Sequence, residues 1–227
     1  MADPQPPTTL STLTTRLLLI LGDPEANRFT AEITQEGFRL ALSEYSYAAP
    51  NIYGKIFTVV QAGREQALPV AGEDEDAVIF PGLISITRVL YPYTGETAFE
   101  LDPLQRYYFY FTDGCPVLYI GGQRVPSVGE QIHIDYAAAH QIDGLAEASI
   151  CTVPTHDFEL ILQGAAGHAA RLRTSIYNES FSAHPELKAF ALDNLAQFRA
   201  TLRQLRRQAN HQALPAAGFK VDGWDGK

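Results

Sequence analysis

Cysteine, basic residues and long apolar runs are all scarce in this sequence, and each shortage excludes a class of protein. Two cysteines among 227 residues cannot form a disulfide framework, and so few are typical of a reducing compartment. The longest apolar run, residues 17–21, has five residues, whereas a membrane span needs about 18. No basic stretch followed by an apolar segment opens the chain, so we expect no secretory signal and no membrane partner.

Basic residues are outnumbered, with 17 Lys and Arg against 26 Asp and Glu, for a net charge of −9. Residues 1–153 hold 8 basic against 19 acidic residues, and residues 154–227 hold 9 against 7. A protein that grips nucleic acid through its phosphates needs clustered Lys and Arg, so this balance argues against one. It remains compatible with a surface that DNA passes without binding.

The first fifty residues predict a short arm followed by a helical hairpin. Residues 1–8 contain three prolines and are expected to be extended. Leucines at helical spacing predict a helix from about Leu10 to Leu21, and the Gly22-Asp23-Pro24 sequence ends it. Thr30 is the expected N-cap of a second helix, which Pro50 ends.

The middle of the chain is rich in β-branched and aromatic residues between turn signals. It predicts one small antiparallel sheet of five or six strands. Hairpin turns are expected at Asp113-Gly114 and Gly121-Gly122. The expected strands cover residues 55–61, 77–80, 83–91, 106–112, 116–120 and 130–137.

Helical periodicity returns after Gly144, with helices expected from His156 to Tyr177 and from Pro185 to about Asn210. The predicted fold class is therefore α+β: N-terminal and C-terminal helical hairpins form a bundle, and a small antiparallel β-sheet module is inserted between them. The expected divisions are an arm and hairpin at 1–50, a β-rich insertion at 51–144, a second hairpin at 145–210 and an extended tail at 211–227.

Catalytic and cofactor signatures are lacking. No nucleophile elbow or phosphate loop occurs, and Cys115 and Cys151 match no catalytic signature. His133 and Asp135, two apart on a strand, face the same side, and with His140 and Asp143 they form a conceivable metal or small-molecule site. A polar strand face that runs into a turn is the favoured interpretation of these residues. We expect no enzymatic activity, no catalytic residue, no metal and no cofactor.

Two features point to assembly instead. Gly164, Ala165, Gly167 and Ala169 leave one helix nearly bare, so that another helix can approach it closely, either inside the bundle or in a neighbouring subunit. In the tail, Phe219, Val221 and Trp224 are candidate anchors for docking to a portal protein or a subunit, although a disordered terminus is the alternative.

A basic patch is predicted near the end of the last helix. It is a contact surface for an acidic partner or a solvated face, and it is weak as a nucleic-acid site because the chain is acidic. The patch consists of Arg199, Arg203, Arg206 and Arg207.

The order of these segments resembles the head–tail adaptor, or connector, proteins of tailed bacteriophages. The similar stretches are residues 17–24 (LLLILGDP) followed by Phe29-Thr30 and Ile33, the return from the β insertion at residues 136–144 and 152–154, the Gly- and Ala-rich helix at 164–170, and the long helix at 185–210 with its tail. The resemblance covers most of the chain, and the β module matches only in kind.

This resemblance implies a structural virion protein made in the host cytoplasm and located in the neck of a phage. Its copies would form a ring, usually dodecameric, between the portal protein and the tail or neck proteins, and viral DNA would pass through the ring without sequence-specific binding. Two alternatives remain. One is a tail-completion or terminator ring protein, and the other is a small-molecule enzyme or binding domain that uses the β module.

Overall fold

The computed structural model describes residues 9–69, 80–95, 106–176 and 185–213 of the chain. The chain divides into two compact units. We call residues 1–49 together with 141–227 the helical unit, and residues 50–140 the β unit. The described residues that precede and follow the β unit therefore belong to one helical unit, and the β unit is one continuous insertion.

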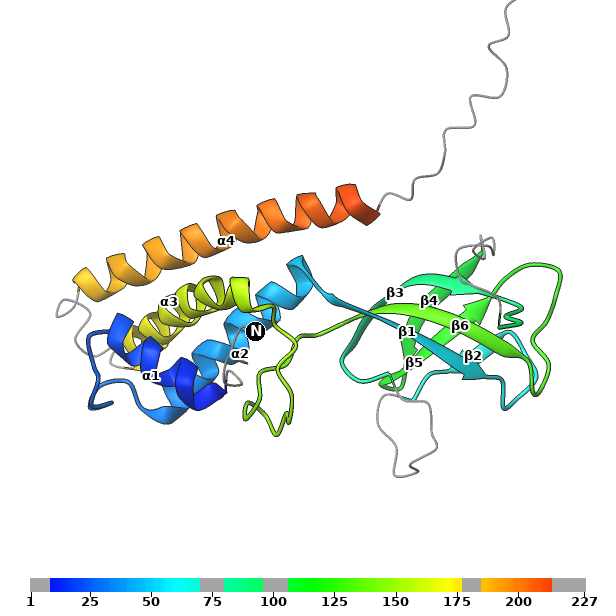
Figure 1. Ribbon diagram of the computed structural model, residues 1–227, viewed down its shortest axis with the longest axis horizontal. Coiled ribbons are helices and arrows are strands. Elements are labelled where there is room, and N and C mark those ends of the chain that lie inside the picture. The colour runs from blue at the N-terminus through cyan, green and yellow to red at the C-terminus, as the bar shows by residue number, and fades with distance from the viewer. Residues whose placement is uncertain (1–8, 70–79, 96–105, 177–184, 214–227) are drawn as a thin grey trace, which may run out of the picture. The chain divides into compact units, whose positions relative to one another are not determined.

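Four helices pack together in the helical unit (Figure 1). They are α1 (Leu10–Ile20), α2 (Ala31–Ala48), α3 (Phe158–Ile176) and α4 (Pro185–Ala213), and a short 3-10 turn, Thr155–Asp157, precedes α3. Helix α3 contacts each of the other three. The predicted α+β class with a helical bundle is confirmed. Helix α4 extends three residues beyond the expected end at Asn210.

The end of α1 follows the sequence prediction closely. Leu21 is its C-cap, and Gly22 adopts a left-handed φ of 64°. The Gly22 amide donates to Leu19 O at 3.1 Å and the Asp23 amide to Leu18 O at 2.9 Å, which is the pair of hydrogen bonds of a Schellman motif. Glycine is favoured here because it adopts positive φ without a Cβ clash.

The loop between α1 and α2 is held by a side chain that the sequence did not single out. Both oxygens of the buried Asp23 carboxylate accept backbone hydrogen bonds, from Asn27, Arg28 and Phe29. Burial raises the pKa of Asp23, but these hydrogen bonds outweigh it and hold the pKa below its ordinary value. Thr30 is the N-cap of α2, as predicted, but its side chain makes no capping hydrogen bond.

The β unit contains two three-stranded antiparallel sheets rather than the single sheet that was expected. One has the order β1-β6-β3 and the other β2-β5-β4. The strands are β1 (Asn51–Thr58), β2 (Glu65–Ala67), β3 (Leu83–Leu90), β4 (Tyr107–Thr112), β5 (Cys115–Ile120) and β6 (Gln131–Ala138). Apolar side chains of both sheets, including Phe57, Leu118 and Tyr136, form one buried cluster.

Turn and strand predictions in the β unit had mixed outcomes. Asp113 and Gly114 both have positive φ, 52° and 79°, and connect the paired strands β4 and β5 as a hairpin, as predicted. The hairpin expected at Gly121-Gly122 is wrong, because the strands on either side of it, β5 and β6, belong to different sheets. Residues 77–79 of one expected strand lie outside the described residues, and Phe80 is not in a strand.

Candidate functional site

The four small residues predicted for close helix packing all lie on α3, and they face two different neighbours within the helical unit. A Cβ built on Gly164 would lie 2.8 Å from the Phe198 ring of α4, and one built on Gly167 would lie 2.8 Å from Leu195 Cγ. The other two, Ala165 and Ala169, are buried and pack against Gly37 of α2.

Helix α2 comes equally close on the other side of α3. A Cβ on Gly37 would lie 2.8 Å from the backbone oxygen of Ala165 and 3.2 Å from Ala169 Cβ. Such distances leave no room for a larger side chain unless a helix moves. The structure thus places all four residues in contacts inside one chain, where they allow α3 to lie between α2 and α4.

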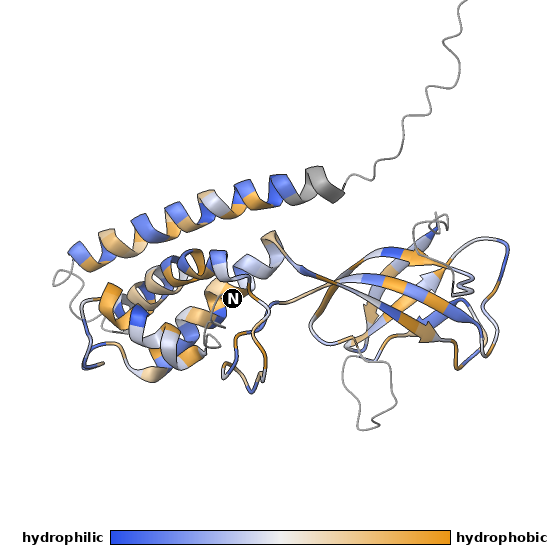
Figure 2. Cartoon of the chain, viewed as in Figure 1, coloured by the Kyte–Doolittle hydropathy of each residue, from blue (hydrophilic) through white to orange (hydrophobic). Residues whose placement is uncertain are grey.

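The predicted basic patch is divided between two environments. The guanidinium of Arg199 binds Glu44 of α2 through two hydrogen bonds, Nε to Oε2 at 2.8 Å and Nη2 to Oε1 at 2.6 Å. The other three arginines, Arg203, Arg206 and Arg207, are exposed. Arg199 therefore joins two helices of the chain, whereas the three exposed arginines lie in turns of α4 that Figure 2 colours mostly hydrophilic.

His168 of α3 completes a polar cluster with Glu44 and Arg199. Its Nε2 lies 3.3 Å from Glu44 Oε1, and only 4% of the residue is exposed. The hydrogen bond from Arg199 holds the pKa of Glu44 below its ordinary value, whereas burial lowers the pKa of His168. At neutral pH the carboxylate is consequently charged and the imidazole neutral. The cluster links α2, α3 and α4, and no spacing in the sequence pointed to it.

The candidate site in the β unit is partly assembled. His133 Nδ1 lies 3.6 Å from Asp135 Oδ1 on β6, but the other oxygen of Asp135 accepts a 2.6 Å hydrogen bond from Arg88 Nε of β3. The His133 ring lies 5.2 Å from that of Tyr93, and His140 is buried beyond the end of β6. Within the described part of the chain, no group of three His, Cys, Asp or Glu residues is arranged to hold a metal ion.

A second polar cluster of the β unit was also missed by the sequence analysis. Glu130 accepts hydrogen bonds from the Tyr91 hydroxyl at 2.6 Å and from the Ser127 amide at 2.9 Å, and it pairs with Arg124. The Tyr91 hydrogen bond, followed by the other two contacts, lowers the pKa of Glu130 to about 2. An acid held charged in this way has a structural role in fixing the loop before β6.

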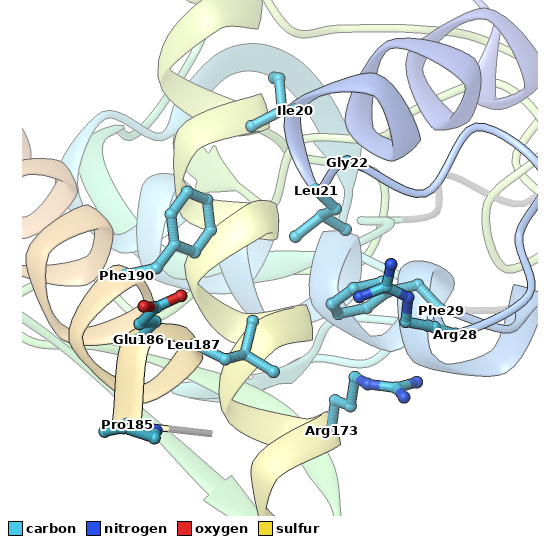
Figure 3. A pocket seen from close by; sticks show the side chains of 10 residues that line it. All are labelled: Ile20, Leu21, Gly22, Arg28, Phe29, Arg173, Pro185, Glu186, Leu187 and Phe190. Atoms are coloured by element: carbon cyan, nitrogen blue, oxygen red, sulfur yellow. The ribbon is translucent and has the colours of Figure 1, made fainter. Parts of the chain in front are cut away.

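A pocket of about 660 Å³ opens between α1 and the start of α4 (Figure 3). Apolar side chains, among them Phe29 and Phe190, line it together with three charged residues. Arg28 and Arg173 lie on one side and Glu186 on the other, and the Arg173 guanidinium lies 5.2 Å from the centre of the Phe29 ring. We call this the α1–α4 pocket; its lining is Ile20, Leu21, Gly22, Arg28, Phe29, Arg173, Pro185, Glu186, Leu187 and Phe190.

Large apolar side chains are exposed on both units. In the β unit they include Tyr108 (66% exposed) and Phe111 (57%) on β4 and Ile52 (54%) on β1, and in the helical unit Leu19 (62%) and Leu192 (59%). The predicted anchors Phe219, Val221 and Trp224 lie outside the described residues. None of the helices in the described ranges is both long and apolar enough to cross a membrane.

No protein-family model matches this chain, and the comparison with curated proteins gives no match. Among solved structures, a chain from "Neck of empty GTA particle computed with C6 symmetry", the neck of a gene transfer agent, is similar at 14% sequence identity with a TM-score of 0.28. The alignment covers 71% of this chain and 80% of that chain. A TM-score this low does not establish a shared fold, so the function proposed below is derived from the residues of this chain.

Proposed function

We propose that this protein is a head–tail adaptor of a tailed phage. Its copies would form a ring, dodecameric by the family resemblance, that joins the portal protein to the tail or neck proteins and continues the DNA channel. The observation that carries this proposal is the arrangement of the chain: helices from its two ends pack into one helical unit, and a β module is inserted between them. The protein would be made in the host cytoplasm and located in the virion neck.

The charged residues of the helical unit support a structural role. Glu44 contacts both His168 and Arg199, which lie on two other helices, and Asp23 accepts three backbone hydrogen bonds. Glu44, Arg199 and Asp23, whose hydrogen bonds hold neighbouring segments together, contribute to the fold. The net charge of −9 fits a channel wall that repels phosphate, so that DNA passes without binding.

A terminator ring protein is the alternative within the virion class. A β-dominated core with no helical hairpin at the N-terminus would favour it. Here the first described elements are the helices α1 and α2, and both pack against α3. This arrangement favours the adaptor.

A small-molecule site in the β module is the alternative from another class. It requires His133 and Asp135 to face a ligand together with His140. Arg88 already neutralises Asp135 at 2.6 Å, and the side chains of both His133 and Asp135 are largely buried. The observed contacts are those of a structural ion pair on the sheet.

Electron microscopy of the purified protein, alone and mixed with its portal protein, tests the proposal. We expect rings with a central channel, seated coaxially on the portal, and a mass by native mass spectrometry that gives the copy number. Removing residues 214–227 should leave the circular dichroism spectrum unchanged but weaken binding to the portal or within the ring. A protein that stays monomeric and does not bind the portal would contradict the proposal.

A further inference from the structure

We propose that the α1–α4 pocket binds the C-terminal segment, residues 214–227, of a neighbouring copy of this chain. The inference rests on the proposed function in one respect, which is that copies assemble side by side. The chemistry of the pocket and the composition of the segment match, and the pocket and the segment lie at opposite ends of α4.

The pocket has the size and lining of a site for an aromatic anchor. At about 660 Å³ it falls in the range of ligand pockets, and Ile20, Phe29 and Phe190 give it apolar walls. Ile20, which lines the pocket, is 44% exposed. An aromatic side chain inserted there would cover this apolar surface, as anchor residues do at protein interfaces.

The C-terminal segment carries the matching groups. Its sequence, LPAAGFKVDGWDGK, has two aromatic residues, Phe219 and Trp224, and Trp224 lies between Asp222 and Asp225. The pocket has two arginines on one side and Glu186 on the other. When Trp224 occupies the pocket, the neighbouring carboxylates of Asp222 and Asp225 can therefore pair with the two arginines, Arg28 and Arg173. Lys220 can pair with Glu186.

The donor segment and the receiving pocket belong to opposite ends of one helix. Pro185, Glu186 and Leu187 at the start of α4 line the pocket, whereas the segment follows Ala213 at its end. With 29 residues at about 1.5 Å each, α4 is roughly 43 Å long. Trp224 is eleven residues beyond Ala213, which span at most about 40 Å when fully extended.

Trp224 could therefore reach the pocket of its own chain only by running back along α4 fully extended. A neighbouring copy can present its segment without that restriction. Because the two complementary surfaces lie at different places on one chain, their contact is heterologous, and heterologous contacts close into rings when the rotation allows it. The pairing thus supplies a means of ring closure as well as an occupant for the pocket.

A peptide of residues 214–227 with a fluorescent label tests the pairing, and the receptor is the full-length chain with Trp224→Ala so that its own segment is disabled. We expect saturable binding that weakens about tenfold or more with Arg28→Glu in the receptor, which corresponds to about 1.4 kcal/mol. Arg39→Glu makes the same charge change at an exposed position of α2 and should alter the affinity less than twofold.

A peptide with reversed charges tests whether Arg28 contacts its acidic residues. A peptide with Asp222→Arg and Asp225→Arg should bind the Arg28→Glu receptor better than it binds the receptor that retains Arg28. Absence of saturable binding up to millimolar peptide, as when another part of the same chain fills the pocket, would overturn the proposal. Equal affinities for the Arg28→Glu and Arg39→Glu receptors would also overturn it.

Disulfide cross-linking tests the source of the segment. Glu186→Cys and Asp225→Cys are introduced into a full-length chain with Cys115→Ser and Cys151→Ser, and the protein is oxidised under conditions in which rings form. We expect a ladder of cross-linked chains, whereas a product confined to single chains would refute binding between copies. A chain that forms rings but yields neither peptide binding nor a ladder refutes this inference while the proposed adaptor function stands.

Discussion

The helical unit and the β unit differ in how they use their small and their aromatic residues. In the helical unit, small residues are buried at helix contacts: Ala165 and Ala169 against α2, and Gly164 and Gly167 against α4. In the β unit, aromatic residues both fill the core, as Phe80 and Tyr136 do, and stand exposed on β4.

The small residues of the helical unit thus build its interior, whereas the β unit leaves aromatic side chains on its surface. The core of the helical unit leaves little space for larger side chains at its helix contacts. Sheets of three strands expose one face or edge more readily, so the β unit can present Tyr108 and Phe111 without loss of its core. We therefore expect substitutions in the interior of the helical unit to affect stability, and substitutions on β4 to affect contacts.

The largest expected effect is that of a larger side chain on the buried face of α3. Ala169→Leu overpacks the contact with Gly37 and should lower the free energy of unfolding by about 1–3 kcal/mol. Urea denaturation followed by circular dichroism measures it. The matched control is Ala200→Leu on an exposed position of α4, which should change stability by less than about 0.5 kcal/mol. Equal stability of the two variants would show that the α2–α3 contact is loose.

Substitution of Arg199 should cause the next largest loss of stability. Arg199→Ala removes both hydrogen bonds to Glu44, and because the two side chains are partly exposed the loss should be about 1 kcal/mol. Arg207→Ala, on an exposed turn of the same helix, should cost less than about 0.5 kcal/mol. The same denaturation experiment compares them, and a larger loss for Arg207→Ala would contradict the division of the basic patch.

Between about pH 7 and pH 5, the stability of the helical unit should depend on pH because of His168. Burial lowers the pKa of His168 below its ordinary 6.5, so the unfolded chain binds the proton at a higher pH than the folded chain does. Stability therefore falls as the pH drops below about 6.5. The contribution of Glu44, whose pKa lies below its ordinary 4.5, is lost only as the pH falls below that value.

His168→Leu should flatten the stability profile between pH 7 and pH 5, as measured by urea midpoints at each pH. His156→Gln is the control, because that side chain is 81% exposed. A profile of the His168→Leu chain as steep as that of the unsubstituted protein would assign the acid sensitivity to other groups.

The smallest effect on stability is expected on β4. Tyr108 is 66% exposed and contacts Tyr119 with ring centres 6.0 Å apart, so Tyr108→Ser should cost only about 0.5 kcal/mol. Phe109→Ser on the same strand, at a half-buried position, should cost more. If Tyr108→Ser destabilised the protein as much as Phe109→Ser, the exposed face of β4 would be part of the fold rather than a surface for contacts.

Local signals in the sequence predicted the structure well where the cause is local. The Gly22-Asp23-Pro24 sequence ends α1, because a glycine at positive φ closes its last turn. Asp113-Gly114 makes the hairpin between β4 and β5 for the same reason. Helix periodicity located all four helices to within a few residues at each end.

Long-range partners could not be predicted from the sequence. Spacing grouped Arg199 with three other arginines, but its partner Glu44 is 155 residues away. Strand β2 has the sequence EQA without a β-branched residue, and it forms because it pairs with β5. The division into two sheets depends on which strands β5 and β6 pair with, and no turn between them reveals it.

Cryo-electron microscopy of the neck of particles assembled with this protein tests the central claim most directly. The adaptor account predicts a closed ring of this chain between the portal and the tail, around a channel that contains or admits DNA. A particle whose neck lacks this chain, or in which the chain lies outside the neck, would contradict the account.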